Sequence, residues 1–300
     1  MATGDKLVTV AQAAEHLGKT PQGPSSTGSK LVTMGQLKSA VDGSAPSSSG
    51  KLVTLSQLER VSTLKIVSWA DGTDEEIAAM VAAADAGQIN LSDYWNEGDT
   101  RTVRLSAMSG SVANANESHA AQDVQFVLTD PGHYTLANGK PCNFVVLQKD
   151  CLKESGVMNS QDTNSGGWND CPRRTWCNSV YRNAIPSTLR GMFKQFKVRT
   201  ANGSGSGVTE STDWFSLFSE KEVFGSTSYA DSSVESQNTQ LDWYKTSSNR
   251  IKRMNGSAVL WWERSPRSGN SRQFCHVTSS GTASWNFARY RSHLAPFGCI

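Results

Sequence analysis

Six cysteines are the residues of this sequence best suited to metal or redox chemistry. They are Cys142, Cys151, Cys171, Cys177, Cys275 and Cys299. The closest pair lies in CPRRTWC, and its five-residue gap exceeds the spacing of roughly two to four residues that is typical of zinc sites. The five histidines are scattered and add no ligand pattern. We therefore expect packed or free thiols, because without an export signal the reduced state is the default.

Motifs of common catalytic centres are missing from the sequence. It contains no G-x-S-x-G nucleophile elbow, no H-E-x-x-H zinc motif and no phosphate-binding glycine loop. A carboxylate pair such as Asp242 and Glu263 can be drawn, but many other acidic pairs are equivalent to it. The sequence therefore favours a protein that is not an enzyme and needs no cofactor.

The C-terminal region, residues 261–300, combines a structural frame with side chains typical of binding surfaces. LWW, RSP and LAPFGCI supply the small, apolar, proline and glycine residues of a folded frame. Between them, aromatic, cationic and short polar side chains alternate without a hydrophobic period, most densely in WNFARYRSH, Trp285–His293. Rings provide large rigid contact areas, and short polar groups adapt their hydrogen bonds. We assign to a ligand-binding face the interleaved residues Arg267, Ser268, Asn270, Ser271, Arg272, His276, Trp285, Asn286, Phe287, Arg289, Tyr290, Arg291, Ser292 and His293.

A purely structural interpretation of the same stretch stays open. Surface loops commonly contain serine, asparagine and arginine, and rings in irregular segments are often buried. We favour a binding surface for Trp285–His293, because cationic side chains alternate there with rings. For WWERSP the structural interpretation is favoured, with Trp261 and Trp262 in the core and Arg264 bonded to backbone carbonyl groups.

Charge and hydropathy exclude two classes of partner. The net charge is only +2, with acids and bases mixed, which argues against binding nucleic acid through a basic face. The longest apolar runs, Glu75–Gly87 and Asn143–Gln148, are shorter than the roughly 18 residues of a membrane span. The start, MATGDKLVTV, lacks the basic-then-apolar pattern of an export signal. We expect a soluble protein that inserts into no membrane.

Residues 1–60 contain three similar units joined by Pro/Gly/Ser-rich linkers. The units begin with KLVT at Lys6, Lys30 and Lys51. Each has a T-x-x-Q capping box, such as Thr9 with Gln12, followed by apolar residues at helical spacing. A helix of about ten residues is marginal alone, so we expect these units to attach to another protein or to assemble subunits. The alternative is a poorly ordered tail.

Residues 61–300 read as one globular region of mixed structure. A capping box at Thr73 and Glu76 predicts a helix that ends near Gly87. Three β-rich runs, residues 100–108, 122–130 and 142–150, predict neighbouring strands of an antiparallel sheet. Residues 176–200 show helical spacing interrupted at Pro186, which predicts two helices. This mixed order indicates the α+β class.

Several motifs resemble a lectin-like domain family of gut bacteria and their phages. They are SWADGTDEEIAAM, GDTRTVRL, QDVQFVL, GGWNDCPRRTWCNSVYRNAIPSTL, DWFSLFSEKEVFG, WWERSP and LAPFGCI, spread over Ser68 to Ile300. The family is similar to the formylglycine-generating-enzyme type of C-type lectin fold, so the resemblance implies a C-type-lectin-like domain. Glu263 departs from the family, which usually has an apolar residue in WW-x-RSP. Those enzymes have two copper-binding cysteines near their C-terminal part. Cys275 and Cys299 are the only candidates for them in this sequence, and neither lies in the motif of those enzymes.

The C-terminal pattern also resembles the variable proteins of diversity-generating retroelements, of the kind exemplified by the phage major tropism determinant. Adenine changes in asparagine codons give Ser, Arg, His, Tyr, Phe and Asp, and most interleaved positions fit that set, whereas Trp285 does not. The resemblance implies a phage tail-fibre or tail-tip protein in the virion. Its partners would be a bacterial surface receptor, protein or glycan, and other virion tail proteins, and it would form a homotrimer. The alternative is a prophage-encoded or bacterial surface-displayed protein with the same domain.

Overall fold

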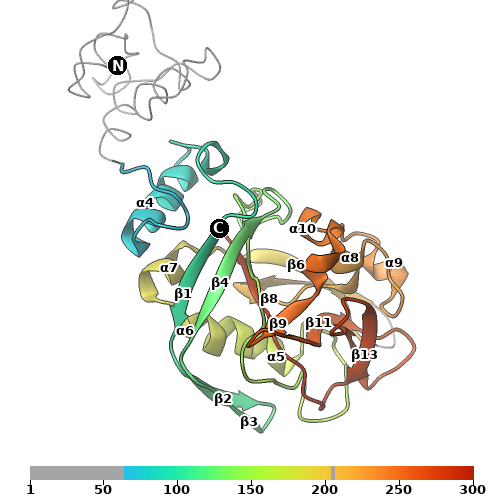
Figure 1. The fold of residues 1–300 in the computed structure, drawn as a ribbon. Coiled ribbons are helices and arrows are strands. Elements are labelled where there is room, and N and C mark those ends of the chain that lie inside the picture. Colours follow the sequence, from blue (N-terminus) through green and yellow to red (C-terminus); the bar gives the residue numbers. More distant parts are fainter. Residues whose placement is uncertain (1–63, 204–206) are drawn as a thin grey trace, which may run out of the picture. The chain divides into compact units, whose positions relative to one another are not determined.

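The computed structural model describes residues 64–203 and 207–300 (Figure 1). The predicted repeats within residues 1–60 lie outside this part of the chain. The described residues belong to two compact units. The larger consists of Ser68–Val81 and Leu91–Ile300, and the described residues of the smaller are 64–67 and 82–90.

Helix α4, Asp74–Asp85, begins at the predicted capping box. The Thr73 amide donates to the Glu76 carboxylate at 2.9 Å, and the Glu76 amide donates to the Thr73 hydroxyl at 3.3 Å. These two bonds satisfy amides that the first helical turn leaves open. The chain leaves the helix at Gly87, whose φ of 70° suits glycine. The predicted start and end of this helix are confirmed, and a short 3₁₀ turn, η3, Leu91–Asp93, follows.

A five-stranded antiparallel sheet forms the centre of the larger unit (Figure 1). Its strand order is β1, Thr100–Leu105; β4, Gln122–Thr129; β5, Val145–Gln148; β14, Phe297–Cys299; and β8, Phe215–Ser216. The three strands predicted from the sequence are neighbours, because β4 pairs with both β1 and β5. Strand β14 was not predicted, and it lies between β5 and β8.

Three two-stranded hairpins accompany this sheet. They are β2, Met108–Val112, with β3, Ala115–His119; β6, Phe196–Ala201, with β7, Val208–Asp213; and β9, Lys252–Met254, with β10, Ser257–Val259. Ala113 and Asn114 have positive φ in the first turn, which permits its tight two-residue loop. The prediction of helix up to residue 200 was wrong, because Phe196–Ala201 pairs as a strand with alternating burial.

Short helices fill the remaining connections. Before Pro186 the chain runs continuously through α5, Pro172–Trp176, the π-helical turn η4, Cys177–Tyr181, and α6, Arg182–Ala184. Helix α7, Ser187–Met192, follows it, so the predicted interruption is confirmed. The others are α8, Glu220–Phe224; α9, Ser232–Glu235; α10, Asp242–Lys245; and the 3₁₀ turn η5, Ser247–Arg250. The fold is of the α+β class, as predicted.

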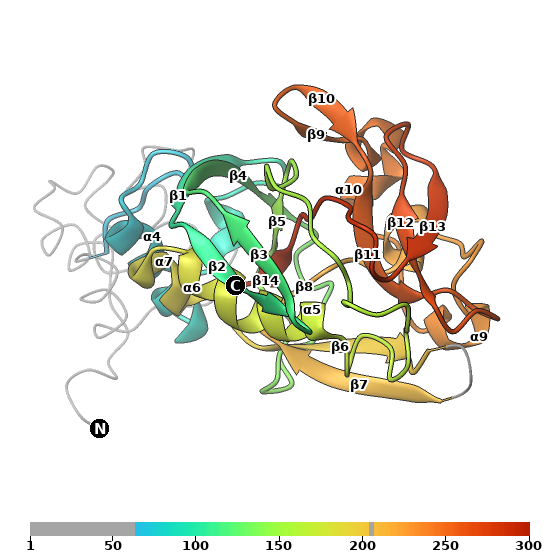
Figure 2. The same ribbon diagram turned by 90° about the horizontal axis from the view of Figure 1, so that it is seen from below.

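A second sheet carries most of the C-terminal region (Figure 2). Its strands are β11, Trp261–Pro266; β12, Gln273–Val277; and β13, Ala283–Phe287, paired antiparallel in that order. All of WWERSP is buried, and Arg264 donates to the Leu217 carbonyl at 2.8 Å and to the Glu222 carboxylate. The predicted core role of this segment is confirmed.

None of the helices that the structure describes has the length and apolar content of a membrane-spanning segment.

Candidate binding surface

Strand β13 is an edge strand of its sheet, because among the strands that the structure describes it pairs only with β12. All five of its residues are half-buried, whereas all five residues of β12 are buried. Side chains alternate along a strand, so Trp285 and Phe287 lie on the same face. The edge position therefore places two large, half-buried rings on one face of the strand.

Tyr290 extends these rings into a row beyond the end of the strand. The ring centroids of Trp285 and Phe287 are 6.3 Å apart, with the planes nearly perpendicular at 86°. Those of Phe287 and Tyr290 are 5.5 Å apart. Such edge-on and tilted pairs are favourable arrangements for rings. Tyr290 is 48% exposed. We call Trp285, Phe287 and Tyr290 the aromatic row.

Each ring of the aromatic row has an arginine beside it. The guanidinium carbon of Arg267 lies 4.1 Å from the Trp285 centroid, and that of Arg272 lies 5.1 Å from the Phe287 centroid. Arg289 is 5.8 Å from the Tyr290 ring. An exposed cation–ring contact contributes about 0.5–1 kcal/mol. These contacts hold the arginines against the rings and keep their hydrogen-bond donors near the surface.

Asp162 connects two of these arginines from a distant part of the chain. Its carboxylate Oδ2 lies 3.0 Å from a nitrogen of Arg272 and 3.0 Å from a nitrogen of Arg289. The Asp162 side chain is only 8% exposed, whereas both arginine side chains are more than half exposed. A buried carboxylate is less screened by solvent than a surface one. Asp162 therefore fixes two exposed cations in place.

The remaining assigned residues lie at the borders of this arrangement. Exposed Arg291 donates to the Ser155 carbonyl at 2.7 Å, and the half-buried His293 ring contacts the Leu152 carbonyl at 3.0 Å. The Asn270 side chain accepts from the Arg272 amide at 2.9 Å. The β11–β12 connection also carries exposed Ser268 and Ser271, and half-buried Asn286 lies in β13.

Two assigned residues do not reach the surface. His276 is 6% exposed because it lies in the central strand β12, where its ring packs 5.9 Å from that of Trp262. Burial lowers the pKa of His276 to about 4, so the ring is neutral near pH 7. Ser292 is 1% exposed, and its backbone pairs with Gly156. Neither side chain can contact a ligand in this structure, so His276 and Ser292 are not part of the candidate binding surface.

Within residues 64–203 and 207–300, no group of three His, Cys, Asp or Glu side chains is arranged to hold a metal ion. All six cysteines are free and buried. Burial raises the pKa of Cys171 to about 11 and that of Cys151 to about 12, and it also raises the pKa of Cys275 and Cys299. These four thiols therefore stay protonated near pH 7 and are not activated nucleophiles.

Comparison with known proteins gives one family. Residues 143–298 match the family described as a domain of unknown function, DUF6273. No curated protein and no solved structure matches the chain. The matched segment is more than half of the 300 residues, and it includes Asp162, the aromatic row and its three arginines. The chain therefore belongs to the DUF6273 family.

Proposed function

We propose that this protein is a phage tail-fibre or tail-tip protein that binds a bacterial surface receptor without catalysis. The observation that supports this most directly is the aromatic row, in which each of three partly exposed rings has an arginine beside it. Tyrosine, tryptophan and arginine are the residues that contribute most at binding hot spots. The receptor can be a protein or a glycan, since rings and guanidinium groups bind both.

The surface is organised before any partner arrives. Asp162 holds Arg272 and Arg289, and contacts between neighbouring rings restrict the aromatic row. Ordering a flexible side chain on binding costs about 0.5–1.5 kcal/mol. Arginines that are already fixed avoid part of that cost, so the arrangement favours affinity.

Burial along the C-terminal region supports a diversified face. The frame segments WWERSP and LAPFGC are buried, whereas Ser268, Ser271, Arg272, Arg289 and Arg291 are exposed. Exposed positions tolerate substitution better than close-packed ones. In this proposal a C-type-lectin-like domain keeps its frame while the exposed positions vary between receptors.

The N-terminal repeats complete the proposal. Residues 1–60 would attach the chain to other virion tail proteins or assemble a homotrimer, and several copies would add avidity. Deleting residues 1–60 should therefore change oligomer mass or virion incorporation. If neither changes, the repeats have no assembly role.

The direct test replaces Tyr290 and Arg291 together with alanine. Loss of a hot-spot side chain costs about 2 kcal/mol or more, a decrease of about thirtyfold in affinity. Binding of the labelled protein to host cells should fall accordingly, and the melting temperature should stay unchanged because both side chains are exposed. A matched control replaces Arg104 and Val208, an exposed arginine and an exposed apolar residue elsewhere. Equal binding by both double variants would refute the proposed surface.

Diversification has its own test. Codons 261–300 would be deeply sequenced in a population grown from one clone. Changes confined to exposed positions, with the frame segments constant, would support a diversified receptor-binding protein. A uniform sequence would instead favour a fixed recognition domain, as in a bacterial surface-displayed protein.

A further inference from the structure

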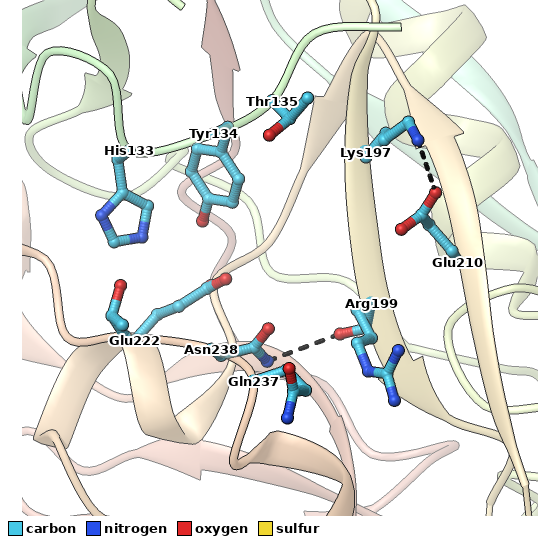
Figure 3. A pocket seen from close by; sticks show the side chains of 10 residues that line it. His133, Tyr134, Thr135, Lys197, Arg199, Glu210, Glu222, Gln237 and Asn238 are labelled. Carbon is cyan, nitrogen blue, oxygen red and sulfur yellow. Dashed lines mark hydrogen bonds and ion pairs between the residues drawn. The ribbon is translucent and has the colours of Figure 1, made fainter. Parts of the chain in front are cut away.

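A separate cavity of about 280 Å³ lies among the segment that contains Tyr134, hairpin β6–β7, helix α8 and the loop after α9 (Figure 3). None of its lining residues belongs to the binding surface described above. Most of the cavity lining is polar, and its inner and outer parts offer different chemistry.

The inner part offers one hydrogen-bond donor next to one acceptor. Tyr134 is 7% exposed, and within the described residues its hydroxyl group makes no hydrogen bond of normal geometry, although it lies beside the Glu222 carboxylate. Figure 3 shows this hydroxyl pointing into the space between His133, Glu222 and Asn238. Burial, with the neighbouring Glu222 carboxylate, raises the pKa of Tyr134, so the hydroxyl keeps its proton. A buried donor without a partner is unfavourable, and a ligand acceptor would satisfy it.

Glu222 supplies the acceptor. Its Oε2 accepts from Arg264 at 2.5 Å and from the Ser219 amide at 2.8 Å, whereas its Oε1 accepts from Arg264 at 2.6 Å. Oε1 therefore retains capacity for a further donor. A ligand hydroxyl can accept from Tyr134 and donate to Glu222, so this pair complements an alcohol.

The outer part contains two cations, Lys197 and Arg199, and one carboxylate, Glu210, which lies across the hairpin from Arg199. Lys197 and Glu210 pair with each other at 3.0 Å. Arg199 lies on the same strand as Lys197, and its exposed guanidinium group makes no ion pair or side-chain hydrogen bond with any residue that the structure describes. A guanidinium group can donate two parallel hydrogen bonds to a carboxylate. The Asn238 amide, which donates to the Arg199 carbonyl at 3.5 Å, lies between the two parts.

We propose that this cavity binds a small hydroxylated carboxylate, the chemical class to which uronic acids belong. A ligand hydroxyl takes the Tyr134–Glu222 position, and the ligand carboxylate takes Arg199. The volume is just below the roughly 300 Å³ at which pockets for drug-sized ligands begin, so it suits one sugar-sized ring. The proposal is independent of the function proposed for the aromatic row.

Titration calorimetry of the full chain with three probes separates the two parts of the site. Glucuronate carries hydroxyls and a carboxylate, glucose lacks the carboxylate, and acetate lacks the hydroxyls. Glucuronate should bind, and the other two should bind at least about tenfold more weakly, because each loses one set of hydrogen bonds. Failure of glucuronate to bind with a dissociation constant of about 10 mM or tighter would overturn the proposal.

Two variants test the assigned residues. Arg199→Gln should reduce glucuronate affinity to that of glucose, whereas the exposed control Arg104→Gln should change nothing. Tyr134→Phe should weaken glucuronate binding about tenfold without lowering the melting temperature, because within the described residues the hydroxyl makes no hydrogen bond of normal geometry. Unchanged glucuronate affinity in both variants would overturn the assignment. The Tyr290–Arg291 double alanine variant should bind glucuronate normally, which distinguishes this site from the receptor-binding surface.

Discussion

Replacing Glu263 with leucine is expected to stabilise the protein, and to do so more strongly as the pH rises. Glu263 is completely buried in β11, and within the described residues neither oxygen of its carboxyl group has a hydrogen-bond partner. Burial raises its pKa well above 4.5, and the nearby carboxylates Glu220, Glu235 and Glu222 add to the effect. The folded protein therefore holds this side chain in its neutral form.

The magnitude has two parts. A buried polar group without a partner costs about 1–3 kcal/mol, and leucine removes that cost at any pH. In the unfolded chain Glu263 ionises near pH 4.5, so above this pH the unfolded state binds fewer protons than the folded state. The free energy of unfolding then falls by about 1.4 kcal/mol per pH unit until the folded pKa is reached. Between pH 5 and the folded pKa the advantage of leucine should therefore grow by about 1.4 kcal/mol for each pH unit.

Urea unfolding at pH 5, 6 and 7 measures this difference. With a slope of about 1–3 kcal/mol per molar urea, the pH-dependent part alone shifts the midpoint by roughly 0.5–1.4 M for each pH unit below the folded pKa. Glu263→Gln is the matched control, since it stays polar but cannot ionise. The free energy of unfolding of this variant should equal that of the unsubstituted protein near pH 5 and exceed it at pH 7. A leucine variant less stable at every pH, or a difference that does not change with pH, would refute the reasoning.

Three further predictions concern other buried groups. Glu117→Gln should destabilise the protein by about 3–5 kcal/mol at pH 7, because buried Arg173 loses the carboxylate that it contacts at 2.6 Å. Burial disfavours the Glu117 carboxylate, but His119 and Arg173 outweigh this effect and lower the pKa of Glu117 to about 2. The stability that the carboxylate contributes is therefore present above pH 4.5 and is lost as the pH falls toward 2. If acid unfolding shows the same stability difference between the variant and the unsubstituted protein near pH 2 as at pH 7, this explanation is wrong. Asp162→Asn should weaken cell binding about three- to tenfold by releasing Arg272 and Arg289, with the Arg104→Gln variant as the control, and full binding would show that Asp162 does not organise the surface. A thiol reagent should label none of the six buried cysteines in the native protein and all six in denaturant, and rapid native labelling would argue against their burial.

Local signals in the sequence were sufficient to predict several helices and strands. Thr73 and Glu76 lie three residues apart before an alanine-rich segment, and they form the predicted cap of α4. The strands over residues 100–105 and 122–129 follow from their alternation of apolar and polar residues. Pro186 interrupts the helical region because proline cannot continue an α-helix in its interior.

Pairing between distant segments limited the other predictions. The apolar residues Met192, Phe193 and Phe196 also fit helical spacing, and pairing with β7 is what makes residues 196–201 a strand. His276 lies among the candidate residues by composition, but its place in a central strand buries it. The composition of Trp285–His293 located the aromatic row. Asp162 carries no such signal, because an aspartate in a polar loop resembles an ordinary turn residue.

The position of β14 between β5 and β8 has a consequence for how the protein folds during synthesis. Phe297–Cys299 pairs with Val145–Leu147 on one side and with Phe215–Ser216 on the other. The ribosome produces β5 and β8 long before β14, so both strands have an unpaired inner edge until residue 299 is made. Unpaired edges can associate with other chains, and contacts between distant segments form slowly. Newly made chains should therefore depend on chaperones until β14 inserts.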